Sequence, residues 1–129
     1  MIEIIVANGR QKNRVEDYAR SIMFELMPRK KKGQIYIEFK NEVVIDDYSY
    51  KGVAYGDKNA VDIEIARDTT EDMMVTLAHE LVHVKQFFRG EIPSSKKIKT
   101  TGSFHMTSDE FEKEAYLYED HLYMTHWWK

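Results

Sequence analysis

The segment between residues 68 and 90 constrains the fold of this 129-residue chain more than any other part of the sequence. Residues 68–70 are capping residue types, Asp68 and Glu71 fit a capping box, and Gly90 fits a helix C-terminus. Between these ends, apolar residues recur at helical spacing and form one stripe: Met74, Leu77, Leu81, Val84 and Phe88. The spacing predicts a helix that turns this stripe toward a hydrophobic core.

The rest of the chain carries short strand patterns and two further helical patterns. Strands are expected at 2–7, at 35–39 and on both sides of a "GDKN" turn at 56–59, and helices at 14–28, ended by Pro28, and at 107–124. Residues 42–52 are ambiguous, and the polar segment 90–106 is expected to be a loop or flap. These patterns predict a single α+β domain over residues 1–129, with a small mixed or antiparallel sheet, an N-terminal helix and two C-terminal helices.

Composition narrows the classes of partner. Hydrophobic residues make up 43% of the chain and charged residues 32%, as in ordinary globular proteins. The net charge of −3 argues against a nucleic-acid or membrane partner, and the basic clusters at 29–32 and 96–97 are typical of solvated turns. The N-terminus does not resemble a signal peptide, and no apolar run reaches membrane-spanning length. We therefore expect a cytoplasmic location, in a cell or in an infected host.

Residues 76–86 read "TLAHELVHVKQ" and contain the pattern HExxH. His79 and His83 are one helical turn apart, so both imidazoles can reach one point. Neutral imidazoles are zinc ligands, and Glu80 follows the first histidine, where it can exchange a proton with a water on the metal. The chain has no cysteine, so any transition metal must be held by His, Asp or Glu.

A catalytic zinc of this kind needs a third protein ligand. The last helical pattern offers acids: Glu110, Glu112, Glu114 and Glu119. We expect Thr107 or Ser108 to cap this helix, and its apolar stripe is Phe111, Ala115, Tyr118 and Leu122. Acids at a helix N-terminus also favour the helix dipole, which suffices for Asp109 and Glu110. Periodicity alone does not choose between Glu112 and Glu114, which flank the stripe on opposite sides.

HExxH followed by a glutamate on a later helix resembles the gluzincins, which are zinc peptidases. Their second motif often places a small residue three positions after the glutamate, as in Glu112-Lys113-Glu114-Ala115. Over roughly residues 50–123, the chain is similar to short zincin-like proteins of phage and bacterial genomes, which carry "HELVHVKQ", a glycine, a loop and a stretch like "EKEAY" (112–116). The resemblance implies a sheet beside the active-site helix, with one strand edge available to a peptide.

The resemblance also implies roles for single residues: His79, His83 and Glu112 bind zinc, and Glu80 is catalytic. Many gluzincins have an acid or Asn directly after the small residue as a partner for a histidine, whereas this chain has Tyr116 there. Glu114 therefore stays as the alternative ligand. Glu112→Gln is expected to weaken zinc binding, and Glu110→Gln and Glu119→Gln are not.

The function expected from these features is a zinc-dependent metallopeptidase acting on a peptide or protein. The alternative is a zinc-binding regulatory or protein-binding module that does not hydrolyse peptides. Several side chains could stabilise an oxyanion, and the sequence does not choose among them: Tyr116, Tyr118, Tyr123, His105, His121 and His126. His105 lies in the expected loop, which could bring it over the metal.

Overall fold

The structure, a computed structural model, describes residues 1–101 and 109–128. Within them the helices are α1 (Lys12–Leu26), α2 (Thr70–Phe88) and α3 (Glu110–His126). The strands are β1 (Glu3–Val6), β2 (Gln34–Lys40), β3 (Val43–Ile45), β4 (Tyr48–Tyr50), β5 (Gly52–Gly56), β6 (Ala60–Ala66) and β7 (Ile98–Thr100). The predicted α+β class, with one N-terminal and two C-terminal helices, is confirmed.

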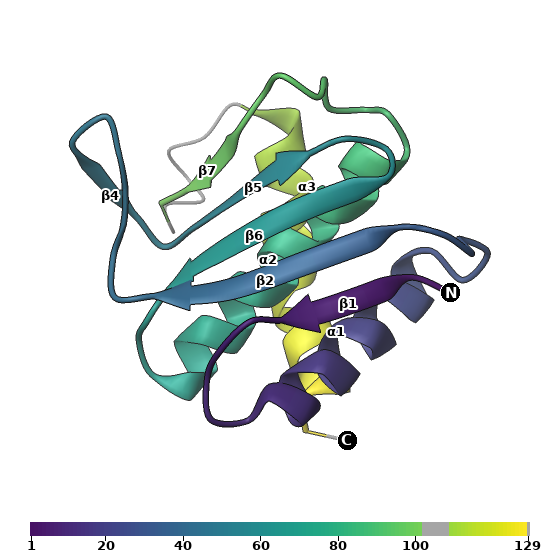
Figure 1. Ribbon diagram of the computed structural model, residues 1–129, viewed down its shortest axis with the longest axis horizontal. Helices are drawn as coiled ribbons and strands as arrows, with labels where there is room; N and C mark the ends of the chain where they lie inside the picture. The colour runs from purple at the N-terminus through teal and green to yellow at the C-terminus, as the bar shows by residue number, and fades with distance from the viewer. Residues whose placement is uncertain (102–108, 129) are drawn as a thin grey trace.

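The main sheet is mixed and has the strand order β1-β2-β6-β5-β7 (Figure 1). β1, β2 and β6 run parallel, whereas β5 pairs antiparallel with both β6 and β7. The expected hairpin around the "GDKN" turn is therefore present as β5 and β6. The ambiguous segment forms the separate β3–β4 hairpin, whose turn residues Asp46 and Asp47 have φ of 52° and 68°.

β7 corrects the expectation that residues 90–106 are only a loop. Ile98 and Thr100 are buried and Lys99 between them is partly exposed, so the segment alternates as a strand does. Three residues are too few for such a pattern to stand out among polar neighbours, and pairing with β5 stabilises the strand. The sheet edge beside α2 is thus formed by a segment that the sequence does not predict to be a strand.

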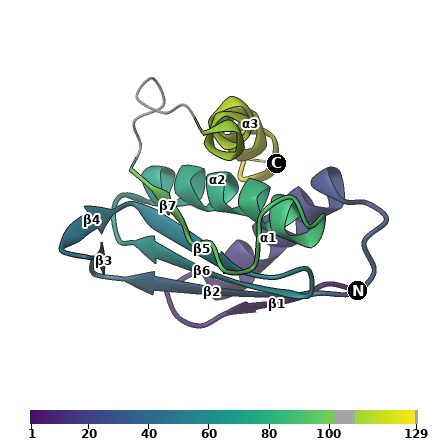
Figure 2. The same ribbon diagram turned by 90° about the horizontal axis from the view of Figure 1, so that it is seen from above.

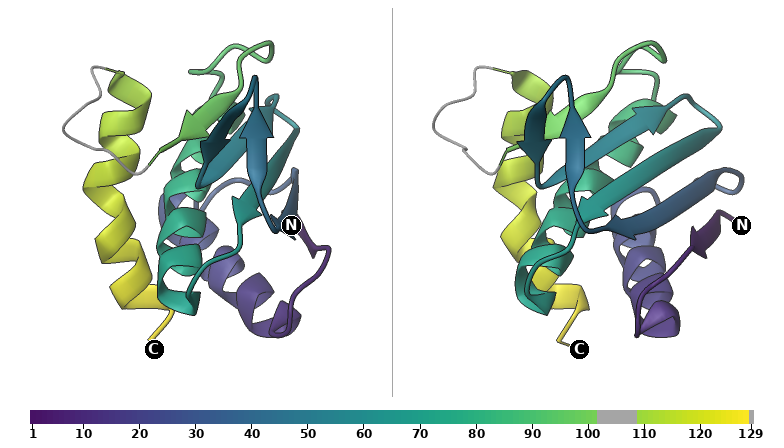
Figure 3. Two further views of the ribbon diagram at one scale, coloured as in Figure 1. Left: turned by 90° about the vertical axis from the view of Figure 1, so that its left-hand side faces the viewer. Right: turned by 60° about the vertical axis from the view of Figure 1, so that its left-hand side comes forward.

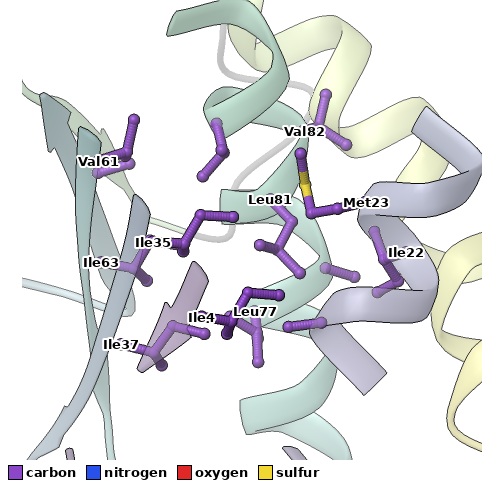
Figure 4. Packing of buried hydrophobic residues seen from close by; sticks show 14 of the residues in the cluster. Ile4, Ile22, Met23, Ile35, Ile37, Val61, Ile63, Leu77, Leu81 and Val82 are labelled. Atoms are coloured by element: carbon purple, nitrogen blue, oxygen red, sulfur yellow. The ribbon is translucent and has the colours of Figure 1, made fainter. Parts of the chain in front are cut away.

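The molecule has three layers. All three helices lie on one side of the sheet, with α1 and α2 against it and α3 on the outer side of α2 (Figures 2 and 3). In the core, Leu77 and Leu81 of α2 meet isoleucines of β2 and β6 from one side and Ile22 of α1 from the other (Figure 4). β2 and β6 supply these isoleucines because their buried and partly exposed residues alternate.

α2 is more deeply buried than its apolar stripe predicts. Every residue from Thr76 to Phe88 is buried, because the sheet covers one side of the helix and α3 covers the other. The predicted capping box is off by one residue: Thr69 is the N-cap and its hydroxyl accepts the Asp72 amide at 3.2 Å. Gly90, with φ of 74°, ends the helix as predicted.

Asp109 is the N-cap of α3, and its carboxylate accepts a hydrogen bond from the backbone amide of Phe111 at 2.8 Å. The two residues expected to cap it, Thr107 and Ser108, lie outside the described residues. The predicted core position of Tyr118 is wrong, since its exposed fraction is 41%, whereas Tyr123 is 3% exposed. Among the described residues, no helix is both long enough and apolar enough to cross a membrane.

Candidate metal centre

Two histidines of α2 face α3 from inside the protein. His79 and His83 are 1% and 0% exposed, and their ring centroids are 5.0 Å apart. On the opposing helix Ala115 is fully buried, which lets the backbone of α3 come close to α2. Helical spacing sets the two imidazoles side by side, and the small residue brings the next helix within reach of them.

The third residue of the site is Glu112, on the first turn of α3. Its Oε1 lies 3.0 Å from Nε2 of His79 and 2.5 Å from Nε2 of His83. The donor atoms of all three residues lie within 4.8 Å of one another. Zinc bonds of about 2.0–2.1 Å require donor atoms this close, so two nitrogens and one oxygen here suit a transition metal.

The alternative ligand, Glu114, points to other partners. Its carboxylate accepts hydrogen bonds from Nζ of Lys85 and Nε2 of Gln86, both at 2.7 Å. Among the described residues, the group whose donor atoms converge contains Glu112 and not Glu114. The geometry therefore favours Glu112, while zinc binding itself stays a prediction.

Both histidines are held through the ring nitrogen that faces away from Glu112. His79 Nδ1 donates to Glu119 Oε1 at 2.8 Å, and His83 Nδ1 donates to Gln86 Oε1 at 2.7 Å. When both rings are neutral and carry their proton on Nδ1, the lone pairs of both Nε2 atoms can be offered to a metal. The sequence offered Glu119 only as one of four acids near the site and assigned no role to Gln86.

The partner of His79 is Glu119, and not the residue directly after Ala115, where the resemblance to gluzincins leads one to expect it. In this chain that position is Tyr116, whose ring packs edge-on against His79 with centroids 4.4 Å apart. Glu119 follows Glu112 by seven residues, which is about two helical turns, so both carboxylates lie on one face of α3. That spacing is the signal by which the sequence could have indicated it.

The charges of the site stabilise one another. Burial alone would lower the pKa of His79, but its bonds to Glu112 and Glu119 outweigh burial and raise the pKa. Burial alone would raise the pKa of Glu112, but its contacts with His79 and His83 hold it well below the usual range. The carboxylate of Glu112 is therefore ionised at neutral pH, as a metal ligand must be.

Glu80 lies between the histidines and the sheet, and its carboxylate has a different environment. It is 0% exposed, and neither of its carboxylate oxygens has a hydrogen-bond partner among the described residues. Burial raises its pKa. An unpartnered buried polar group costs about 1–3 kcal/mol, so such a group in a native fold calls for a functional explanation.

A cavity of about 420 Å³ opens beside His79. It lies between α2, α3 and the sheet edge, and its lining includes Thr76, Thr100 and Glu119. One side of the candidate metal centre is therefore hollow and within reach of the edge strand β7.

The structure places the other polar candidates differently. His121 and His126 both donate from Nε2 to Glu25 of α1, at 3.0 and 2.8 Å, so they tie α3 to α1 instead of facing the metal centre. The ring of Tyr116 packs against His79. His105 lies outside the described residues.

Comparison with known proteins yields no relative from which a role could be transferred. No family model, no curated protein and no solved structure matches this chain. The interpretation of the site therefore depends on its residues and their geometry.

Proposed function

We propose that this chain is a zinc-dependent metallopeptidase with a zincin-like fold, in which His79, His83 and Glu112 bind the metal and Glu80 is the general base. The observation that supports it most strongly is the convergence of His79 Nε2, His83 Nε2 and Glu112 Oε1 inside the protein. Two histidines and one glutamate form the ligand set of catalytic zinc sites that keep a fourth position open.

The hydrogen bonds and the charge of the ligand residues also suit zinc. The Nδ1 atoms are fixed by Glu119 and Gln86, and the ionised Glu112 balances part of the charge of a divalent cation. When bound, zinc would supply the Lewis acid that activates a water and polarises a peptide carbonyl.

Glu80 would move the proton. It directly follows His79 on α2, so its carboxylate lies beside the metal ligands and not among them. Among the described residues no hydrogen bond occupies its oxygens, which leaves them able to accept a proton, and burial raises its pKa. In the proposed reaction it accepts a proton from the attacking water and passes it to the amine that leaves.

The substrate would be a peptide or a protein segment in an extended conformation. β7 is the last strand in the sheet order and lies next to the cavity beside His79. An extended peptide can add to such an edge by backbone hydrogen bonds, which would place its carbonyl groups along the site.

A zinc-binding module without peptidase activity is the second candidate. It is favoured by the burial of Glu80, since a carboxylate with 0% exposure is closed to solvent. Such a protein would use zinc to hold α2 and α3 together and would not need Glu80.

The substitution Glu80→Gln distinguishes the two candidates, because it keeps the size of the side chain and removes the base. For a peptidase we expect zinc content and melting temperature near wild type, with cleavage of a peptide library reduced by about 10²–10⁴-fold. Glu71→Gln, an exposed change at the start of the same helix, is the matched control. Equal cleavage by wild type and Glu80→Gln would contradict the mechanism, and zinc binding without cleavage in the wild type would favour the second candidate.

A further inference from the structure

The carboxylate of Glu80 is directed at one residue pair of the sheet. Gly52, at the start of β5, and Thr100, at the end of β7, are partners in the antiparallel register, and both are buried. We call this pair the Gly52–Thr100 rung. The sequence reasoning singled out neither residue, because they lie 28 and 20 positions from Glu80 along the chain.

Gly52 leaves space for the carboxylate. A Cβ atom at this position would lie 2.7 Å from Oε2 of Glu80 and 3.0 Å from Cγ2 of Thr76. The φ angle of Gly52 is not in the left-handed region, so its backbone conformation does not require glycine. The approach of side chains from α2 gives the physical reason for a glycine here.

Thr100 brings a hydroxyl to the same place. Three buried side-chain atoms lack a hydrogen-bond partner in the described part of the chain, and they are Oε1 and Oε2 of Glu80 and Oγ1 of Thr100. Thr100 lies close to Glu80 and also lines the cavity beside His79, although its exposed fraction is only 2%. Unpartnered polar atoms are rare in native interiors, so their gathering at one point indicates a shared role.

We infer that the Gly52–Thr100 rung positions the general base. Gly52 leaves the space into which the carboxylate fits, and the Thr100 hydroxyl, which has no hydrogen-bond partner among the described residues, is the donor available to orient it. Thr100 is thus a positioning residue that acts through Glu80. The inference rests on the proposed function where it calls Glu80 the base, but the contact itself does not depend on catalysis.

A double-mutant cycle tests the contact without any substrate. Thr100→Val is made in the wild type and in Glu80→Leu, and the urea midpoint of each protein is measured. We expect Thr100→Val to lower the midpoint in the wild type and to leave it unchanged or raised in Glu80→Leu, where no carboxylate needs the hydroxyl. Thr101→Val, the same change at the exposed neighbour, is the control. Equal shifts in both backgrounds would overturn the inference.

Gly52→Ala gives a second, steric readout. It should lower the urea midpoint in the wild type and do so much less in Glu80→Ala, because the closest contact is then removed. An equal loss of stability in both backgrounds would show that the side chain of Glu80 is not the reason for a glycine at position 52.

Measurements of turnover then distinguish a positioning role of Thr100 from an effect on the stability of the fold. Thr100→Val should lower kcat by about 10–100-fold with KM and zinc content unchanged, and Thr100→Ser should restore most of it because the hydroxyl is kept. A Thr100→Ser variant as slow as Thr100→Val would contradict the role of the hydroxyl. If the zinc-loaded wild type cleaves no library peptide, the peptidase proposal fails, and the double-mutant cycle still decides whether the rung holds Glu80.

Discussion

His79 and His83 differ in the group that holds their outer nitrogen. His79 donates to a carboxylate, whereas His83 donates to the neutral amide oxygen of Gln86. A carboxylate increases the basicity of the imidazole more than an amide does, so His79 should be the stronger electron donor to a metal. The amide of Gln86 has a separate function, since its Nε2 also bonds to Glu114 and to the carbonyl oxygen of Phe111, which fixes α3 beside α2.

The contact between Glu119 and His79 revises the expectation that a change at Glu119 leaves zinc binding unaffected. We predict that Glu119→Leu weakens zinc binding by about 10–100-fold, because His79 then loses its carboxylate partner. The dissociation constant can be measured by competition with a chromophoric chelator. Asp120→Asn, a change at the exposed neighbour, should have no effect. Equal affinities of Glu119→Leu and wild type would show that the contact with His79 does not matter to the metal.

The part of the site that lies on a single helix could be predicted from the sequence. His79, Glu80 and His83 are linked by helical spacing, which a sequence shows directly. Glu112 could not be separated from Glu114, because that choice depends on how α3 turns toward α2. Gln86 was missed although it follows His83 by three residues on the same helix, and Thr100 was missed because its strand was not predicted.

At the scale of elements, the buried face of α3 is partly polar. Glu112 is buried and Glu119 half-buried on this face, next to the apolar Ala115 and Leu122. A stripe drawn only through apolar residues therefore included Tyr118, which lies on the outer face. Because acidic residues occupy part of the buried face, the apolar residues alone do not show which face of α3 is buried.

The two tyrosines of α3 provide a matched test of this orientation. Tyr123→Ala should lower the free energy of unfolding by about 3 kcal/mol, as expected for a large buried side chain. Tyr118→Ala should lower it by less than about 1 kcal/mol, since that side chain is largely exposed. Urea denaturation measures both, and the reverse order of the two effects would mean that α3 is turned the other way.

In the whole molecule, polar contacts attach α3 to both helices of the middle layer. The candidate metal centre joins it to α2, and Glu25 joins it to α1 by accepting bonds from His121 and His126. The three helices and the strands β1, β2, β5 and β6 could be predicted from periodicity, but β7 and the choice between a mixed and an antiparallel sheet could not. The stacking of sheet and helices as three layers could not be predicted either, because the burial of α2 on both sides follows from where α3 packs.

The contact at Glu25 predicts a pH dependence. Burial alone would raise the pKa of Glu25, but the bonds from His126 and His121 outweigh it and lower the pKa in the folded protein. A pKa lowered by folding contributes stability above the unfolded value of about 4.3, and this stability is lost as pH falls through the folded pKa.

Glu25→Gln should therefore be less stable than wild type at neutral pH, and the difference should shrink as the pH falls below about 4. The difference in stability can be measured as urea midpoints between about pH 7 and pH 3, an interval that includes the ordinary pKa of a glutamate. Exposed Glu42→Gln is the control. A difference that stays constant over this range would contradict the ionic contribution of Glu25.

The central claim is that His79, His83 and Glu112 hold one zinc ion, and the most direct test is elemental analysis of the purified full-length protein. The claim predicts about one zinc per chain in the wild type, a clear loss in His79→Ala and Glu112→Gln, and retention in Glu114→Gln. Removing the metal with a chelator should lower the melting temperature of the wild type. No zinc above background in the wild type, or loss of zinc from Glu114→Gln while Glu112→Gln keeps it, would contradict the claim.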